Sequence, residues 1–263
     1  MSQVAADTLG VPVQRVRFEL GDSTLPPAPV SGGSSTVPSV APAVLAACQA
    51  VRGKIFDLAR SDAQLGWHDV PTDTLRLQNG AVVAPGGSVP VAALLQRAGQ
   101  DAVEAEAGAA LEDSAKHYSR RAFGAQCAEV LVDPDLGTIR VNRWVAAFDA
   151  GQVLNAQTAH SQLIGGITFG IGMALLEETH VDAETGRIVN SSVAEYLMPV
   201  NADVPDIQAV FVANDERNSN PLGVKGVGEL PMVGVAAAIA DAVYHATGVR
   251  VRKVPIRIED VLV

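Results

Sequence analysis

A glycine-rich stretch with a single carboxylate is the first candidate for chemistry in this sequence. Residues 218–234 read NSNPLGVKGVGELPMVG and contain four glycines, Lys225 and Glu229. Pro231 suits the first turn of a helix, which would place Glu229 directly before the positive end of a helix dipole. A deeply set carboxylate at that junction is a candidate general base. A capping glutamate, or one paired with Lys225, is the alternative, and local chemistry alone favours it.

Two further segments could approach a ligand closely. Residues 31–36 (SGGSST) offer amides and hydroxyls ahead of a helix, an arrangement that can hold a phosphate or an anionic cofactor. A flexible turn is the alternative. The stretch HSQLIGGITFGIGMALLEE (160–178) carries four glycines in a predicted helix, where each costs about 1 kcal/mol relative to alanine. Either something approaches this backbone, with Gln162 at the entry, or helices pack tightly against it.

Several common catalytic patterns are absent from the sequence. Gly226 and Gly228 begin a G-x-G-x-x-G pattern, but Pro231 occupies its third glycine position. The five histidines lack metal-ligand spacing, and no G-x-S-x-G elbow occurs. Cys48 and Cys127 are too few for an iron–sulfur cluster, and we expect both to be buried thiols. Zinc enzymes and acyl-transfer hydrolases are therefore poor candidates.

Composition limits the classes of protein to which the chain can belong. Its 263 residues are 48% hydrophobic and carry a formal net charge of -10, which argues against non-specific nucleic-acid binding. No uncharged apolar run is long enough to predict a membrane span. The first residues, MSQVAADTLG, do not resemble a signal peptide, so we expect a cytoplasmic location.

The elements that must position these segments alternate between hairpins and helices, without the regular repeat of a doubly wound sheet. The pattern predicts an α+β fold with two interleaved subdomains. We expect residues 101–115 to form an exposed acidic segment. Helices are expected at 1–9, 38–59, 88–99, 157–176 and 231–246, hairpins around Asn79-Gly80 and over 126–149 and 179–189, and strands at 13–20 and 207–213, the last of them buried.

Taken together, the ordered motifs resemble one family. The segments SGGSST, FGAQCAEVLVDPDLGTIRV, SQLIGGITFGIGMALLEE, NPLGVKGVGELP and ATGVRVRKVPI are similar, in this order, to the molybdenum-binding subunits of the xanthine oxidase family. That family includes aldehyde oxidoreductases, xanthine dehydrogenases and N-heterocycle hydroxylases. The resemblance covers nearly the whole chain and is weakest over 60–115, which we interpret as a variable insert.

The resemblance implies a molybdenum–molybdopterin cofactor, in the cytosine dinucleotide form of bacterial aldehyde-oxidising enzymes. The metal would be held by the pterin dithiolene, with no protein side chain as a ligand. Glu229 matches the catalytic base of the family. It would deprotonate a molybdenum-bound hydroxyl that attacks an aldehyde, while hydride passes to a sulfido ligand and water restores the oxygen. The implied cofactor-binding residues are Gly33, Ser34, Thr36, Gln162, Lys225, Gly226 and Gly228.

The chain is shorter than subunits of this family, so residues 1–263 resemble their C-terminal cofactor-binding domain, with the N-terminal half absent. We expect that half, an iron–sulfur subunit with a 2Fe-2S cluster and an FAD subunit as partners in a heteromeric complex. The resemblance implies an aldehyde oxidase or dehydrogenase that is inactive as this chain alone. A xanthine or N-heterocycle hydroxylase of the same family and a non-catalytic fragment are the alternatives.

Overall fold

The computed structural model describes residues 1–109, 117–214 and 216–262, and it divides the chain into two units. Unit 1 comprises Met1–Ser119 and Arg217–Gly223, and unit 2 comprises Arg120–Glu216 and Val224–Val263. The chain thus returns to the first unit before it completes the second. This arrangement confirms the predicted α+β fold with two interleaved subdomains. No described helix is long and apolar enough to cross a membrane.

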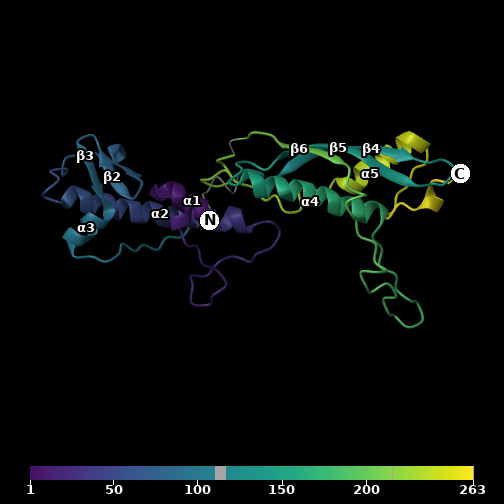
Figure 1. Ribbon diagram of the computed structural model, residues 1–263, viewed down its shortest axis with the longest axis horizontal. Coiled ribbons are helices and arrows are strands. Elements are labelled where there is room, and N and C mark those ends of the chain that lie inside the picture. Colours follow the sequence, from purple (N-terminus) through teal and green to yellow (C-terminus); the bar gives the residue numbers. More distant parts are fainter. Residues whose placement is uncertain (110–116, 215, 263) are drawn as a thin grey trace. The chain divides into compact units, whose positions relative to one another are not determined.

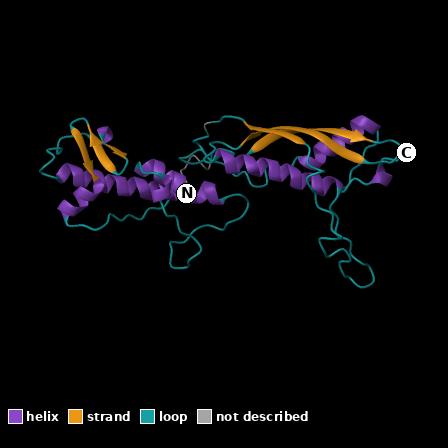
Figure 2. Cartoon of the chain, in the orientation of Figure 1, coloured by secondary structure: helices purple, strands orange, loops and turns teal. Residues whose placement is uncertain are grey.

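Unit 1 packs a small antiparallel sheet against helices (Figures 1 and 2). Asn79 and Gly80 both have positive φ and form the predicted turn between the first two strands. Buried side chains from the sheet and helices, among them Phe56, Trp67 and Val82, form its core. The elements are α1 (Ser2–Leu9), η1 (Val13–Arg15), α2 (Thr36–Ser61), η2 (Thr72–Thr74), β1 (Arg76–Gln78), β2 (Ala81–Ala84), β3 (Gly87–Pro90) and α3 (Val91–Ala98).

Unit 2 is a three-stranded sheet whose inner face is covered by two helices (Figure 2). Strand β4 pairs antiparallel with β5 around the predicted turn, and β5 pairs parallel with β6. Trp144 and Phe148 point from β5 into the core and are fully buried, each stabilising the unit by about 1.5–3 kcal/mol. The elements are β4 (Phe123–Val132), β5 (Ile139–Asp149), α4 (Ala156–Leu175), β6 (Asp206–Phe211), α5 (Val235–Thr247) and η4 (Ile258–Asp260).

The structure corrects four sequence expectations. Residues 13–20 form no strand, because none of the described strands pairs with them; they contain the 3₁₀ turn η1 instead. Strand β6 is half-exposed rather than buried, since its alternate residues face away from the helices. Cys127 is exposed for the same reason on β4, whereas Cys48 is partly buried. The predicted hairpin at 179–189 contains only one isolated bridge, between Val181 and Ile188.

Part of one further prediction can be compared with the structure. Most of residues 101–109 are exposed, as the composition predicts. The rest of that predicted segment, residues 110–115, lies outside the described residues.

Candidate functional site

The loop that carries Glu229 is fixed to the end of β5. The Lys225 N–H donates to the Ala150 carbonyl at 3.0 Å, and Val224 forms an isolated bridge with Gly151. Two successive turns follow, in which the Leu230 N–H donates to Val227 and the Met232 N–H donates to Glu229. Backbone bonds therefore define the path of this loop on both sides of the carboxylate.

A buried ion pair anchors the same loop. Lys225 Nζ lies 3.2 Å from Asp149 Oδ2 and 3.3 Å from Glu216 Oε2. The side chains of Lys225 and Asp149 are only 6% and 2% exposed, so their attraction is weakly screened by solvent. The Lys225 ammonium also lies 5.9 Å from the centre of the Phe123 ring, within the range of a cation–π contact. In unit 2, Lys225 is thus held by carboxylates other than Glu229.

Asp149 is the centre of this network. Its carboxylate accepts hydrogen bonds from the Gly151 N–H at 2.8 Å, from Asn214 Nδ2 at 2.6 Å and from Lys225 Nζ. Burial alone would raise the pKa of Asp149, but these three donors outweigh that effect and hold its pKa below the usual value. Asp149 is therefore ionised at neutral pH and ties β5, the chain near 214 and the Glu229 loop together.

The position of Glu229 differs from the sequence prediction. Helix α5 begins at Val235 rather than at 231, so turns over 228–234 separate Glu229 from the helix. Glu229 is exposed in the structure of this chain, not deeply set. The reason is that buried Pro231 anchors the turn on α4, where a Cβ at Gly166 would lie 2.5 Å from its Cγ. Helix α5 itself is only partly buried: its buried residues Val235, Ile239 and Val243 form a single stripe.

Helix α4 supplies the second part of the candidate site. Gln162 and Gly166 are four residues apart and share one face of the helix, so the packing of Pro231 brings the Glu229 turn to the surface that carries Gln162. Gln162 itself is exposed. Asn155 caps this helix by accepting from the Thr158 N–H, which fixes the helix start near Gln162.

The glycines of α4 serve two purposes. A Cβ at Gly170 would lie 2.4 Å from the Cβ of Val235, so Gly166 and Gly170 admit the residues that lead into α5. Gly172 lies similarly close to Pro199. Gly166, Gly170 and Gly172 therefore support the interpretation that other segments pack tightly against this helix. A Cβ at Gly165, however, would meet nothing within 4 Å, so this glycine leaves a bare patch of backbone beside Gln162.

The loop over 31–36 belongs to unit 1. Gly33 and Ser34 both adopt left-handed backbone conformations, with φ of 57° and 59°. Ser31 and Thr36 share a hydroxyl hydrogen bond of 2.9 Å, and the Ser35 hydroxyl donates to the Gly32 carbonyl. Ser35 makes no side-chain cap to α2, so its hydroxyl leaves the first amides of that helix available to an anion.

The candidate residues therefore fall into two groups. Unit 1 contains Gly33, Ser34 and Thr36, and unit 2 contains Gln162 and the loop of Gly226, Gly228 and Glu229. In unit 1 the uncapped α2 terminus can accept an anionic group such as a phosphate. In unit 2 the bare backbone at Gly165 leaves room for a ligand with hydrogen-bonding groups. Within the described ranges, no cluster of three His, Cys, Asp or Glu side chains could hold a metal ion.

Sequence reasoning missed Asp149 and Asn214. Asp149 is the last residue of a predicted strand, and a carboxylate at a strand end was the one sequence feature that could have marked it as a site residue. Nothing in the local pattern links it to Lys225, because the two residues are 76 positions apart in the chain.

Comparison with known proteins identifies the family. The molybdopterin cofactor-binding domain matches residues 1–205. The aldehyde oxidoreductase molybdenum-binding subunit of Escherichia coli K12 is 37% identical over 262 residues, covering 100% of this chain and 34% of that subunit. A putative xanthine dehydrogenase molybdenum-binding subunit of the same organism is 33% identical over 260 residues, covering 97% and 34%. The chain spans about a third of the length of these curated relatives.

Solved structures agree with this result. The Cu,Mo-dependent CO dehydrogenase superposes with a TM-score of 0.80 at 21% identity, over 99% of this chain and 33% of that chain, which shows the shared fold. Quinoline 2-oxidoreductase from Pseudomonas putida 86 gives a TM-score of 0.73 at 25% identity, over 98% and 34%. The chain therefore belongs to the molybdopterin cofactor-binding domain family and corresponds to the C-terminal portion of its molybdenum-binding subunits.

Proposed function

We propose that residues 1–263 form the C-terminal cofactor-binding domain of a molybdenum hydroxylase that oxidises an aldehyde to a carboxylic acid. The observation that carries this proposal is the exposed Glu229 on a loop fixed by the buried Asp149–Lys225 pair. The similarity to the E. coli aldehyde oxidoreductase subunit along the whole chain favours the aldehyde as substrate. Residues 60–115 are proposed to be a variable insert within this domain.

Each candidate residue has a proposed role in holding the cofactor or moving a proton. A carboxylate oxygen of Glu229 accepts the proton released as the oxygen nucleophile attacks the aldehyde carbon. Lys225 and Asp149 position the loop, and Gly226 and Gly228 let its backbone approach the cofactor. Gln162, beside Gly165, and the donors of Gly33, Ser34 and Thr36 hold the cofactor. When bound, the molybdenum cofactor supplies the oxygen-transfer chemistry and accepts two electrons.

The reaction balance implies electron-accepting partners. An aldehyde and water give a carboxylic acid, two protons and two electrons, and the electrons must leave the domain. We propose that 2Fe-2S and FAD subunits accept them, that the N-terminal part of the molybdenum subunit completes the site, and that the complex is cytoplasmic. The cytosine dinucleotide form of the cofactor is proposed from the resemblance to bacterial aldehyde-oxidising subunits.

N-heterocycle hydroxylation is the second candidate function. The xanthine dehydrogenase relative and the quinoline oxidoreductase structure favour it, because both resemble this chain over nearly its full length. The two candidates use the same candidate residues in this domain and differ in the carbon that is attacked.

The test compares the isolated chain with the chain co-expressed with the remaining part of a molybdenum subunit and its partners. Molybdenum and cytosine nucleotide are measured in each sample, together with the reduction of an artificial acceptor by benzaldehyde or by hypoxanthine. We expect a cofactor-poor isolated chain and an assembled enzyme that oxidises benzaldehyde. Oxidation of hypoxanthine alone would favour the second candidate, and an assembled complex without molybdenum would indicate a non-catalytic fragment.

A further inference from the structure

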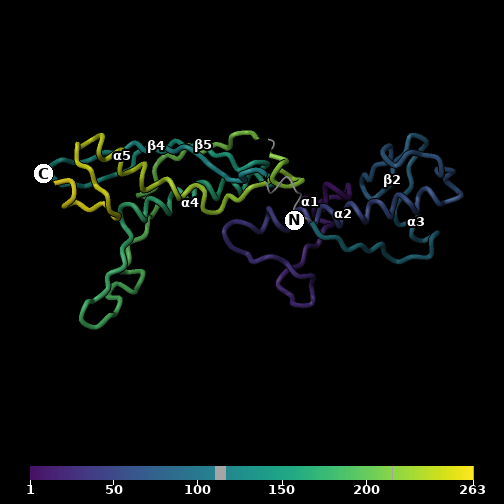
Figure 3. The backbone as a smooth tube through the Cα atoms, turned by 180° about the vertical axis from the view of Figure 1, so that it is seen from behind, coloured from purple at the N-terminus to yellow at the C-terminus, as the bar shows by residue number. Residues whose placement is uncertain are grey.

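A segment of unit 2 that the proposed chemistry does not use carries many exposed apolar side chains. Residues 177–203, here called the arm, connect α4 to β6 and extend away from the rest of unit 2 (Figures 1 and 3). Surface patches of this kind mark interaction sites when they are contiguous. The large apolar residues of the arm that are 51–79% exposed are Val181, Ile188, Val189, Val193, Leu197, Met198 and Val200.

These side chains are exposed although the arm has a defined local structure. The arm has its own hydrogen bonds: Asp182 Oδ1 accepts from the Glu184 and Thr185 amides, and the Val189 N–H donates to the His180 carbonyl at 2.9 Å. Asn190 accepts from the His180 N–H and donates to the Glu178 carbonyl. Polar groups thus order the arm while its apolar side chains face outward, which lowers the entropy cost of binding a partner.

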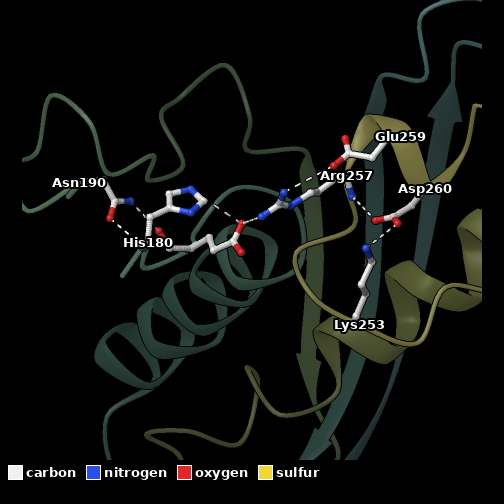
Figure 4. Close-up of polar contacts among 7 residues, drawn as sticks. His180, Asn190, Lys253, Arg257, Glu259 and Asp260 are labelled. Atoms are coloured by element: carbon white, nitrogen blue, oxygen red, sulfur yellow. Dashed lines mark hydrogen bonds and ion pairs between the residues drawn. The ribbon is translucent and has the colours of Figure 1, made fainter. Parts of the chain in front are cut away.

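Ion pairs attach the base of the arm to the C-terminal segment (Figure 4). Arg257 pairs with Glu178 and also reaches Glu259, and these carboxylates raise the pKa of the Arg257 guanidinium. Tyr196 donates to Glu177 Oε2 at 3.2 Å on the arm itself. The arm is therefore held to the body of unit 2 at its base.

A groove of about 470 Å³ lies at the same base. Its apolar lining includes Ile171 and Leu175 from α4 and Ile256 from the C-terminal segment. Four carboxylates line it, Glu178 and Glu259 beside Glu195 and Asp203 of the arm, against two arginines, Arg140 and Arg257. The carboxylates outnumber the arginines, so the groove suits an apolar segment flanked by basic side chains.

The charge of the arm argues against a second copy of this chain as its partner. Residues 177–203 contain six carboxylates and one arginine, and the whole chain has a formal net charge of -10. Two arms facing each other would bring like charges together, which costs free energy. The relatives, by contrast, are about three times as long as this chain and match it from end to end. Most of a molybdenum subunit is thus available to cover the arm.

We infer that the arm and its groove dock the remaining part of the molybdenum subunit, through a surface that combines apolar and basic side chains. The inference rests on the proposed function for the identity of the partner. It assigns the interface to residues 177–203 and to the groove at their base, rather than to the outer face of the β4–β5–β6 sheet.

Co-expression of this 263-residue chain with the part of the E. coli aldehyde oxidoreductase subunit outside the matched third tests the inference. Amide hydrogen exchange is measured on the complex and on the chain alone. We expect arm amides to exchange at least about tenfold more slowly in the complex. Failure of the two pieces to associate, or an arm that exchanges equally fast in both samples, would overturn the inference. So would arm protection in the chain alone that grows with its concentration, because a second copy would then be the partner.

Substitutions locate the interface. Val189→Asp and Val193→Asp should each weaken the complex by about tenfold or more, since each places a charge in an apolar contact. Val210→Asp on β6 is the matched control, because Val210 and Val189 are 58% and 57% exposed. Unchanged affinity in the arm variants, or an equal loss in the control, would refute the assignment to the arm.

Molybdenum content is measured on the same complexes to separate the two proposals. A metal-free complex that is docked through a protected arm would contradict the proposed function and leave this inference intact. A molybdenum-containing complex whose arm amides stay unprotected would contradict this inference and leave the proposed function intact.

Discussion

The two loops proposed to contact the cofactor are held in opposite ways. The Glu229 loop is tied to β5 by backbone bonds, by the buried Asp149–Lys225 pair and by Pro231 packed on α4. The 31–36 loop is mostly exposed, and its hydroxyls bond mainly within the loop. The difference indicates that a group that moves a proton needs a fixed position, whereas donors that hold an anion can adjust to it.

The largest effect should come from Glu229→Gln, which keeps the shape of the side chain and removes the proton acceptor. We expect kcat of the assembled enzyme to fall at least about 10²–10⁴-fold, with an unchanged molybdenum content and melting temperature. The matched control is Glu106→Gln, an exposed glutamate in unit 1. A variant that retains more than about a tenth of the wild-type rate, short of the range for general-base catalysis, would show that Glu229 has a structural role.

Removal of the anchor of the same loop should cost stability. Among the described residues, Asp149→Ala leaves buried Lys225 with Glu216 as its one remaining ion-pair partner, so the free energy of unfolding should fall by about 3–5 kcal/mol. Denaturant unfolding of the isolated chain measures the change. Asp241→Ala, which breaks the exposed pair with Arg250, should cost no more than about 1 kcal/mol. If the free energy of unfolding fell equally in both variants, the buried pair would not hold the Glu229 loop more firmly than an exposed pair could.

The glycines of α4 test how closely the Glu229 turn is packed. Gly170→Ala should destabilise the chain by about 1–3 kcal/mol, because the new Cβ would meet Val235 at 2.4 Å. Gly165→Ala meets no neighbour and should stabilise the helix by up to about 1 kcal/mol. Thermal unfolding of the two variants should therefore shift in opposite directions, and shifts of the same sign would contradict the packing described here.

The pH dependence of stability isolates the contribution of Asp149. Because folding lowers its pKa, its contribution is complete above the pKa of an unfolded aspartate, about 3.9, and is lost as pH falls through the folded value. The stability difference between the wild type and Asp149→Asn should be constant from about pH 7 to pH 5 and shrink below about pH 4. A difference that stays constant down to about pH 3 would mean that the carboxylate charge contributes nothing.

The smallest effect on stability is expected in the 31–36 loop. Ser34→Leu and Thr36→Leu should change the free energy of unfolding by less than about 1 kcal/mol, since the loop is largely exposed. Cofactor content of the assembled enzyme should fall, because bulky apolar side chains block donors near the α2 terminus. Full cofactor content in both variants would indicate that the loop only turns the chain.

The sequence by itself determined the local elements and the family. Hydrophobic periodicity predicted α2 and α4, turn residues predicted the hairpins at Asn79-Gly80 and between β4 and β5, and the order of the motifs indicated a molybdenum-binding subunit. These features depend on neighbouring residues, so a single sequence carries them. The alternating pattern at 13–20 predicted a strand wrongly, because a strand also requires a partner that local pattern does not supply.

Only the tertiary structure decided how the candidate site is held. The Asp149–Lys225 pair joins residues that are 76 positions apart in the chain. Strand β6 pairs parallel with β5 although α4 and the arm lie between the two strands in the sequence. Pro231 reads as a helix start in sequence, yet its packing on Gly166 delays α5 to Val235 and leaves Glu229 exposed. Each outcome depends on burial and on contacts between distant segments, whose free energies outweigh local propensity.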